Sequence, residues 1–352
     1  MTRAEFDRRD FLRRTLVGGA GAVVLAATRS TLLPSVASAQ GLSHARSMDR
    51  AAGMLPLAGT AVCLLGAHAL PRGTEVTQID STLALESELG RQLAIVRRYS
   101  YWDNPPPDSV QLWAAQGGRI PYISWHAYSA GGHNVIPWAS IARGDYDAFI
   151  LQVGQKLAAF GYPIYFSFHH EPENDPANGT PADFQAAFAR VRSVMDSAGA
   201  TNLRWVCTLM ASTFRGGHGG ADAWLPSPSV YTFVGADGYN RFPIVLRPAW
   251  KSFSAVLGAS QQKAASLGKK LFVGEFGTVE QTAGGYAGDP QAKAVWFQDA
   301  ASAITSWGNV EAVNYSHALA TFFGSQMPYW IDTSPQSLAS FKSVAFMPYF
   351  NG

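Results

Sequence analysis

The chain has 352 residues, of which 47% are hydrophobic and 15% are charged. This composition supplies the apolar side chains of a large core and excludes a globally disordered chain. The 27 basic and 25 acidic residues give a net charge of only +2, and several of the basic residues lie in the first 14 positions. A basic surface for nucleic acid is therefore not supported.

The N-terminus has the features of an export signal. An arginine pair, Arg8 and Arg9, is followed by a weakly hydrophobic Gly/Ala-rich stretch at 16–27 and by a small-x-small cleavage pattern at 37–39. The pair resembles a twin-arginine signal. A membrane anchor is the alternative, but the apolar stretch is too short to span a bilayer and Arg29 interrupts it.

These features divide the chain into three parts. We expect a twin-arginine-type signal peptide at 1–39, a linker or loose lead-in at 40–58, and one folded domain at 59–352. The protein would then be exported to the periplasm or the extracellular space. No other stretch is long and apolar enough to cross a membrane, so we expect no membrane association of the mature form.

Eight short apolar runs, rich in β-branched and aromatic residues, alternate with longer amphipathic stretches. The runs are 61–66, 93–99, 120–125, 164–168, 203–209, 233–236, 271–274 and 310–315. Such runs suit strands buried on both faces, and their alternation with helices predicts a closed (β/α)₈ barrel of the α/β class. A doubly wound open sheet is the alternative, but the turn after the first run lacks the glycine-rich phosphate-binding pattern.

The two cysteines, Cys63 and Cys207, both lie in predicted strands. Two buried free thiols are one interpretation, and a disulfide in an exported protein is the other. Neither cysteine belongs to a CxxC pair, so a cysteine metal site is not indicated.

Polar residues follow the C-terminal ends of four predicted strands. They are 125–126, 169–175, 237–240 and 275–277. The strand C-termini of a barrel converge on one face, where active sites are built. We therefore expect Glu171 and Glu275 to meet across the mouth of the barrel. Two carboxylates, one protonated and one ionised, are what cleavage of a glycosidic bond requires.

These motifs resemble those of a known family. A strand ending in His170-Glu171-Pro172 and another ending in Gly-Glu275-Phe-Gly resemble the clan of retaining (β/α)₈-barrel glycosidases. Most members of that clan have Asn before the first glutamate. His in that place, together with the segments 166–171 and 237–240, resembles glycoside hydrolase family 26, whose members are mostly β-1,4-mannanases. The resemblance spans roughly residues 60–345.

The resemblance implies a catalytic domain that acts on a polysaccharide by double displacement and needs no cofactor or metal. Glu171 would be the general acid/base and Glu275 the nucleophile. His170 would contact the substrate or orient the carboxylates, and Tyr239 would donate a hydrogen bond to Glu275.

The resemblance also implies a set of sugar contacts. His126 and Trp125 would line the subsite of the reacting sugar. The family often has an aromatic residue directly after strand eight, whereas Tyr315-Ser316-His317 stands here. Either Tyr315 or Trp330 would therefore form the floor of the cleft.

Other polar residues have plainer interpretations. Glu173 and Asp175 are interpreted as ordinary surface or salt-bridging residues, and His169 as either functional or a satisfied core histidine. Asp237 and Arg98 would form a structural ion pair or support the site. The scattered histidines are interpreted as structural; they are His68, His133, His218 and His317.

Alternatives in function remain open. A β-glucanase or β-xylanase of the same fold is the nearest alternative to a mannanase, and endo and exo action are both compatible with the sequence. A metal-dependent barrel hydrolase would draw ligands from His126, His169, His170, Glu171 and Asp175, although the first strand lacks a His-x-His pair. A non-catalytic sugar-binding protein is the third possibility. We expect a monomer.

Overall fold

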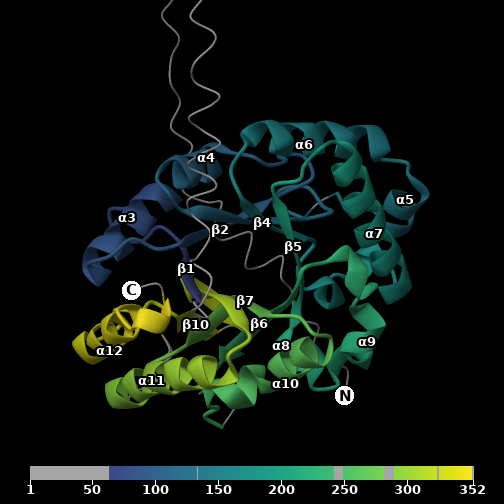
Figure 1. The fold of residues 1–352 in the computed structure, drawn as a ribbon. Helices are drawn as coiled ribbons and strands as arrows, with labels where there is room; N and C mark the ends of the chain where they lie inside the picture. The colour runs from purple at the N-terminus through teal and green to yellow at the C-terminus, as the bar shows by residue number, and fades with distance from the viewer. Residues whose placement is uncertain (1–62, 133, 242–248, 281–288, 323–324, 351–352) are drawn as a thin grey trace, which may run out of the picture.

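The computed structural model describes residues 63–132, 134–241, 249–280, 289–322 and 325–350. Within these ranges, eight parallel strands close into one barrel in chain order (Figure 1). They are β1 (Leu64–Ala69), β2 (Ile95–Ser100), β3 (Ile120–Trp125), β4 (Ile164–Phe168), β5 (Leu203–Met210), β6 (Phe233–Asn240), β7 (Leu271–Thr278) and β8 (Val310–His317). β1 pairs with β8, which closes the barrel and excludes the open doubly wound sheet. The proposed signal peptide, the linker and the predicted domain start at 59 lie outside the described residues.

Helices surround the barrel (Figure 1). They are α3 (Gln78–Leu89), α4 (Ser109–Gln116), α5 (Trp138–Arg143), α6 (Asp147–Phe160), α7 (Pro181–Ser197), α8 (Ala211–Phe214), α9 (Ala221–Trp224), α10 (Phe253–Ser266), α11 (Pro290–Trp307) and α12 (Pro335–Ala345). Local sequence fixes several of their ends. Capping boxes that begin at Thr77, Asp108 and Thr180 satisfy the first backbone N–H groups of α3, α4 and α7. None of the described helices is long and apolar enough to span a membrane.

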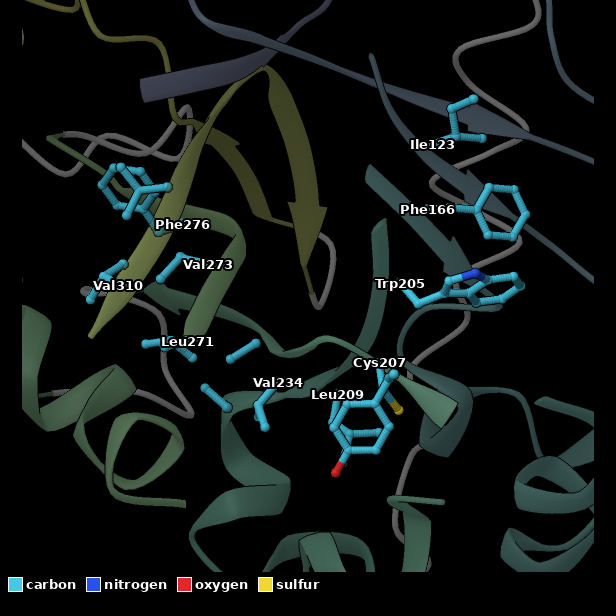
Figure 2. Packing of buried hydrophobic residues seen from close by; sticks show 14 of the residues in the cluster. Ile123, Phe166, Trp205, Cys207, Leu209, Val234, Leu271, Val273, Phe276 and Val310 are labelled. Carbon is cyan, nitrogen blue, oxygen red and sulfur yellow. The ribbon is translucent and has the colours of Figure 1, made fainter. Parts of the chain in front are cut away.

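Alternate residues of each strand face the helices or the barrel axis. The outward layer forms the main core, and Figure 2 shows side chains of this layer from β3 to β8. The inward residues nearer the strand N-termini form a second apolar cluster, in which Tyr122 of β3 and Tyr165 of β4 both pack on Phe272 of β7. Contacts between strands that are not neighbours show that these rings fill the barrel interior. Cys63 and Cys207 are both buried and free, so the disulfide alternative is excluded.

The strand predictions were confirmed for all eight strands, and β3 and β4 have the predicted bounds. β6 and β7 each continue four residues beyond the predicted end, so residues 237–240 and 275–277 lie inside strands rather than after them. A hairpin of β9 (Leu319–Phe322) and β10 (Ser325–Pro328), which was not predicted, follows β8. The sheet, rather than a loop, therefore holds the polar residues at 237–240 and 275–277.

Candidate active site

A bulge in β7 turns Glu275 toward the barrel axis. Ala236 of β6 pairs with Val273, but Asp237 pairs with Glu275, so Gly274 is one extra residue in β7. A Cβ atom on Gly274 would lie 2.4 Å from Oδ1 of Asp237 and 2.7 Å from Nη1 of Arg97. Glycine is therefore the residue that allows the bulge to pack against the groups that surround Glu275.

Three side chains from two other strands bind the Glu275 carboxylate. Arg97 of β2 lies 2.8 Å from Oε1 through Nη2. The hydroxyl of Tyr99 of β2 donates to Oε1, and the hydroxyl of Tyr239 of β6 donates to Oε2. Glu275 is 8% exposed, and Arg97 is fully buried. The expected contact between Tyr239 and Glu275 is thus present, and two further partners, Arg97 and Tyr99, were missed.

These contacts keep Glu275 ionised. Burial would raise the pKa of its carboxyl, but the charge of Arg97 and the hydroxyls of Tyr239 and Tyr99 offset burial, so the pKa lies below its ordinary value. Burial holds the pKa of both tyrosine hydroxyls well above the usual range, so they remain hydrogen-bond donors. The arrangement suits a carboxylate that acts as a nucleophile or a base.

Arg97, rather than Arg98, is the partner of Asp237. Nη2 of Arg97 lies 3.4 Å from Oδ2 of Asp237, and the guanidinium lies over the rings of Tyr99 and Tyr122. Arg98 points to the other side of β2 and pairs with Asp108 at 2.6 Å. The expected pair of Asp237 with Arg98 was therefore wrong, and the partner is the preceding residue, Arg97. Neighbouring residues of a strand point to opposite faces of the sheet, so an error of one position moves a side chain to the other face.

The end of β4 carries two residues with left-handed backbone, His169 (φ 48°) and Glu171 (φ 50°). Non-glycine residues adopt this conformation at a cost, and such strain concentrates at functional sites. The Glu171 N–H donates to the carbonyl of Thr208 on β5 at 2.9 Å. Its side chain is 7% exposed, and Oε2 accepts from Nδ2 of Asn174 at 2.9 Å.

The left-handed turn sends the two histidines in opposite directions. Nδ1 of His169 accepts from the N–H of Ala127 at 3.2 Å, and its ring packs edge-on against Trp138. Its Nε2 lies 2.9 Å from Oδ2 of Asp175. His170 turns inward, with Nε2 3.7 Å from Oε1 of Glu275. His169 is thus a satisfied buried histidine, and His170 belongs to the site.

Histidines and tyrosines at or just after the C-terminal ends of β2, β3 and β4 pack together at the mouth of the barrel. His170 stacks on Tyr99, with ring centroids 5.2 Å apart, and packs edge-on against His126 at 4.6 Å. His126 in turn contacts Tyr128 at 4.5 Å and Tyr101 at 5.6 Å. His126 therefore lies beside His170, its part in sugar binding stays a prediction, and the tyrosines beside it were not foreseen.

Other histidines divide between the site and the scaffold. His68 lies on β1 and packs edge-on against Tyr99 at 4.7 Å, and burial lowers its pKa to about 3, so its ring is neutral. His68 thus lies beside Tyr99, which binds Glu275, whereas the sequence analysis interpreted His68 as a structural residue. His317 accepts the N–H of Ile331 at 3.1 Å, and the His218 carbonyl accepts from Trp224, both as structural contacts. His133 lies outside the described residues.

Two of the proposed aromatic sugar contacts lie in the core instead. Trp125 is fully buried, stacks on Trp102 at 4.7 Å and faces the helices. Tyr315 is also fully buried and packs on Phe276 and Phe341. The alternation of strand residues explains both corrections, because each residue occupies an outward position of its strand.

Trp330, which follows β10 in the chain, is partly exposed to solvent. The guanidinium of Arg72, from the loop after β1, lies 5.2 Å from its ring centroid. Nζ of Lys293 donates to its backbone carbonyl at 2.6 Å, which ties the loop to α11. Of the two residues considered for the floor of the cleft, Trp330 is the one whose placement allows that role.

Glu173 and Asp175 also differ from each other. Asp175 is a pairing partner of His169, within the expected salt-bridging role. Glu173 is buried, 6% exposed, and accepts hydrogen bonds from the Met210 N–H and the Thr213 hydroxyl, both at 2.6 Å. The expectation of an ordinary surface residue was therefore wrong for Glu173.

Two groups of side chains have the spacing of metal ligands among the described residues. In the group of His126, His169 and Asp175, both ring nitrogens of His169 already have protein partners. In the group of His170, Asp237 and Glu275, the Arg97 guanidinium lies against both carboxylates. A resident cation there would have to displace a buried guanidinium, so these donor sets do not fit a divalent metal.

Among curated proteins, the chain is similar to endoglucanase H of Acetivibrio thermocellus, with 26% identity over 275 residues. The match covers 72% of this chain and 28% of that protein, so the chain spans less than a third of its length. No family model matches the chain.

Solved structures with the same barrel include several glycosidases. A GH26 β-mannanase from Bacteroides ovatus superposes with a TM-score of 0.56 and 13% identity, over 82% of this chain and 90% of that one. The GH26 endo-β-1,4-mannanase of Bacillus sp. JAMB-750 gives 0.54 and 15%, over 82% and 86%. Fungal β-1,4-galactanases give 0.52 and 15%, over 74% and 89%. The chain therefore shares its fold with family 26 mannanases, the family that its motifs resemble.

Proposed function

We propose that this protein is an exported retaining glycoside hydrolase of the family 26 type that cleaves the backbone of β-1,4-mannan. The observation that carries the proposal is the Glu275 carboxylate, buried in the mouth of a (β/α)₈ barrel and held by Arg97, Tyr99 and Tyr239. Glu171, on the turn after β4, supplies the second carboxyl. A glycosidase needs such a pair.

The reaction proceeds in two displacements. In the first, Glu275 attacks the anomeric carbon, the bond from that carbon to the leaving oxygen breaks, and Glu171 gives its proton to that oxygen. In the second, Glu171 takes a proton from water, the water oxygen bonds to the anomeric carbon, and the bond to Glu275 breaks. The anomeric configuration is retained, and both glutamates return to their starting states.

The surrounding side chains serve these steps in different ways. Arg97, Tyr99 and Tyr239 keep Glu275 ionised and aim its oxygens at the anomeric carbon. His170 stands beside both glutamates, next to Glu171 in the chain and 3.7 Å from Glu275 in space, where it contacts the substrate. His126 lines the subsite of the reacting sugar, and Trp330 forms the floor of the cleft.

β-Glucan is the second candidate substrate. The mannan assignment is supported by the motif at His170-Glu171, by the segment 237–240, and by the barrels shared with β-mannanases. The name of the curated relative, endoglucanase H, favours a glucan instead. Because the match covers 28% of that protein, its name does not say which of its parts cleaves glucan.

One experiment separates these possibilities. The protein purified from residue 40 onward would be incubated with β-mannan, mixed-linkage β-glucan, carboxymethyl cellulose, β-xylan and β-1,4-galactan. We expect reducing ends from mannan and, by NMR, a first-formed product of β configuration. Activity on a glucan or xylan, with none on any mannan, would reject mannan as the substrate but would leave the double-displacement mechanism in place. Tight binding of a polysaccharide with no hydrolysis by the wild type would favour a sugar-binding protein.

Export by the twin-arginine route belongs to the same proposal. It is supported by the Arg8-Arg9 pair, the Gly/Ala-rich stretch and the small residues at 37–39. Replacement of both arginines by lysine should retain the full-length protein in the cytoplasm, whereas the wild type should be found outside it, beginning at Gln40. Unchanged export of the lysine variant would reject the route. We propose a monomer, which the mass in solution would test.

A further inference from the structure

Glu173 lies two residues beyond Glu171, on the same short 3₁₀ turn (Pro172–Asn174). Its Oε1 accepts two hydrogen bonds of 2.6 Å, from the backbone N–H of Met210 at the end of β5 and from the hydroxyl of Thr213 in α8. Its Oε2 is buried and has no hydrogen-bond partner in the part of the chain that the structure describes. Burial of a carboxyl with one unpaired oxygen costs free energy. The two displacements proposed above give Glu173 no part in the reaction.

The contacts of Glu173 complete a two-point attachment of the Glu171 turn to β5. The first point is the hydrogen bond from the Glu171 N–H to the carbonyl of Thr208. The second is the bond from the Met210 N–H to Glu173, two residues further along the same strand. Glu171 makes the first of these contacts itself and has φ at 50°, a conformation that persists only when its surroundings enforce it.

We propose that Glu173 is a positioning residue for the general acid/base, which fixes the Glu171 turn against β5 and α8. The inference rests on the proposed function, because it assigns Glu173 a role only if Glu171 transfers the proton. Misplacement of a reacting group by 1 Å can lower a rate by about 10²-fold, so an anchor two residues away has a measurable effect.

The charge state of Glu173 agrees with this role. Burial raises the pKa of its carboxyl to about 8, with a further contribution from the negative charge of Glu171. The thiol of Cys207 on β5 also senses the charge of Glu173, and burial keeps the pKa of this thiol well above the usual range. A protonated Glu173 adds no negative charge beside Glu171 and still accepts both hydrogen bonds through its carbonyl oxygen.

The test compares two substrates that differ in their need for an acid. The first is the polysaccharide that the wild type cleaves, and the second is the 2,4-dinitrophenyl β-glycoside of its disaccharide, whose leaving group needs no proton. We expect Glu173→Ala to lower kcat on the polysaccharide by roughly 10²-fold. The first displacement on the aryl glycoside, measured as the rate of dinitrophenolate release, should fall by less than about threefold. Glu173→Gln keeps an acceptor for Met210 and Thr213 and should retain most activity on both substrates.

Two further variants control for folding. Thr213→Val removes one of the two donors and should give a smaller loss with the same substrate selectivity, even if Glu173→Ala fails to fold. Glu311→Ala removes another buried carboxylate, at the opposite end of the barrel beside Tyr165 and Arg204, and should show no selectivity between the substrates. Equal losses on both substrates for Glu173→Ala and Thr213→Val, or none on either, would overturn the role of Glu173.

The outcome also separates this inference from the proposed function. If the wild type cleaves no glycoside, or if Glu171→Ala slows the first displacement equally on both substrates, the proposed function fails. If Glu171→Ala spares the dinitrophenyl substrate while the Glu173 and Thr213 variants show no such selectivity, only the positioning role fails.

Discussion

Nη2 of Arg97 lies 2.8 Å from Oε1 of Glu275, and the same nitrogen lies 3.4 Å from Asp237, although the arginine side chain has no solvent exposure. One buried cation thus serves two buried carboxylates on neighbouring strands. The favourable charge interactions offset the cost of burial only while all three groups are present. The triad of Arg97, Asp237 and Glu275 therefore links the stability of the barrel to the ionisation of Glu275.

Replacement of Arg97 by Met should therefore impair both folding and activity. The loss leaves two carboxylates without their cation, so the free energy of unfolding should fall by about 3–5 kcal/mol, and kcat/KM should fall by at least about 10²-fold. Arg98→Met is the matched control, because Arg98 is the next residue on the opposite face of β2 and pairs with Asp108 at the surface. That change should cost about 1 kcal/mol or less. Denaturant titration measures the free energy of unfolding, and initial rates measure kcat/KM. Equal effects of the two variants on these quantities would contradict the role given to Arg97.

Tyr239→Phe should shift the pH dependence of the reaction. The hydroxyl of Tyr239 helps to lower the pKa of Glu275, so its removal raises that pKa and moves the acidic limb of kcat/KM to higher pH. A hydrogen bond to a charged group contributes about 1.5–3 kcal/mol, which corresponds to a shift of roughly one pH unit or more. Tyr165→Phe, at the other end of the barrel, should leave the limb in place. A shift to lower pH, or none, for Tyr239→Phe would argue against the assigned role.

The fold was predictable because apolar content marks buried parallel strands directly. The ends of β6 and β7 were not predictable in the same way. Gly274 and Gly277 are poor strand formers, yet a Cβ atom there would press against Arg97 or Tyr239, which bind Glu275. Gly238 is needed for another reason, because a Cβ atom there would meet Ala211 and Val256 of the covering helices. The sequence analysis therefore placed Glu275 at the C-terminal end of the barrel but ended its strand too early.

The misplaced site residues share one physical cause. A strand alternates its faces at every residue, so an error of one position exchanges the mouth of the barrel for the core. Arg98 was chosen over Arg97, and Trp125 and Tyr315 were assigned to the cleft, although each lies on the outward face of its strand. Counting in steps of two from Ile95, a core residue of the interior, would have placed Arg97 and Tyr99 inside.

Trp330→Ala should weaken substrate binding with little effect on folding. Trp330 is partly exposed, whereas Trp125 is fully buried. Loss of the proposed sugar contact should raise KM on the polysaccharide roughly tenfold, in keeping with about 1.5–3 kcal/mol for covering an aromatic side chain. Trp125→Ala should instead lower the free energy of unfolding by about 3–5 kcal/mol because it leaves a cavity. An unchanged KM for Trp330→Ala would remove Trp330 from the cleft floor.

Glu173→Gln should change how stability depends on pH. The pKa of Glu173 is raised to about 8 in the folded protein, so the folded state holds a proton that the unfolded state releases between about pH 4.5 and 8. Its contribution to stability is present at low pH and is lost as the pH rises through that window, by up to about 1.4 kcal/mol per unit. Glutamine does not titrate, so the stability of the variant relative to the wild type should increase steadily from pH 5 to pH 8. A constant difference would show that Glu173 is ionised throughout.

The assignment of Glu275 as the nucleophile is the central claim, and covalent trapping tests it most directly. A 2-deoxy-2-fluoro β-glycoside of the sugar that the wild type cleaves, with a dinitrophenyl leaving group, slows breakdown of the glycosyl-enzyme. Mass spectrometry of a proteolytic digest should then locate the added sugar on the peptide that contains Glu275, and Glu275→Ala should acquire none. A label on Glu171, or a wild-type enzyme that turns over its substrate with inversion and is never labelled, would contradict the account.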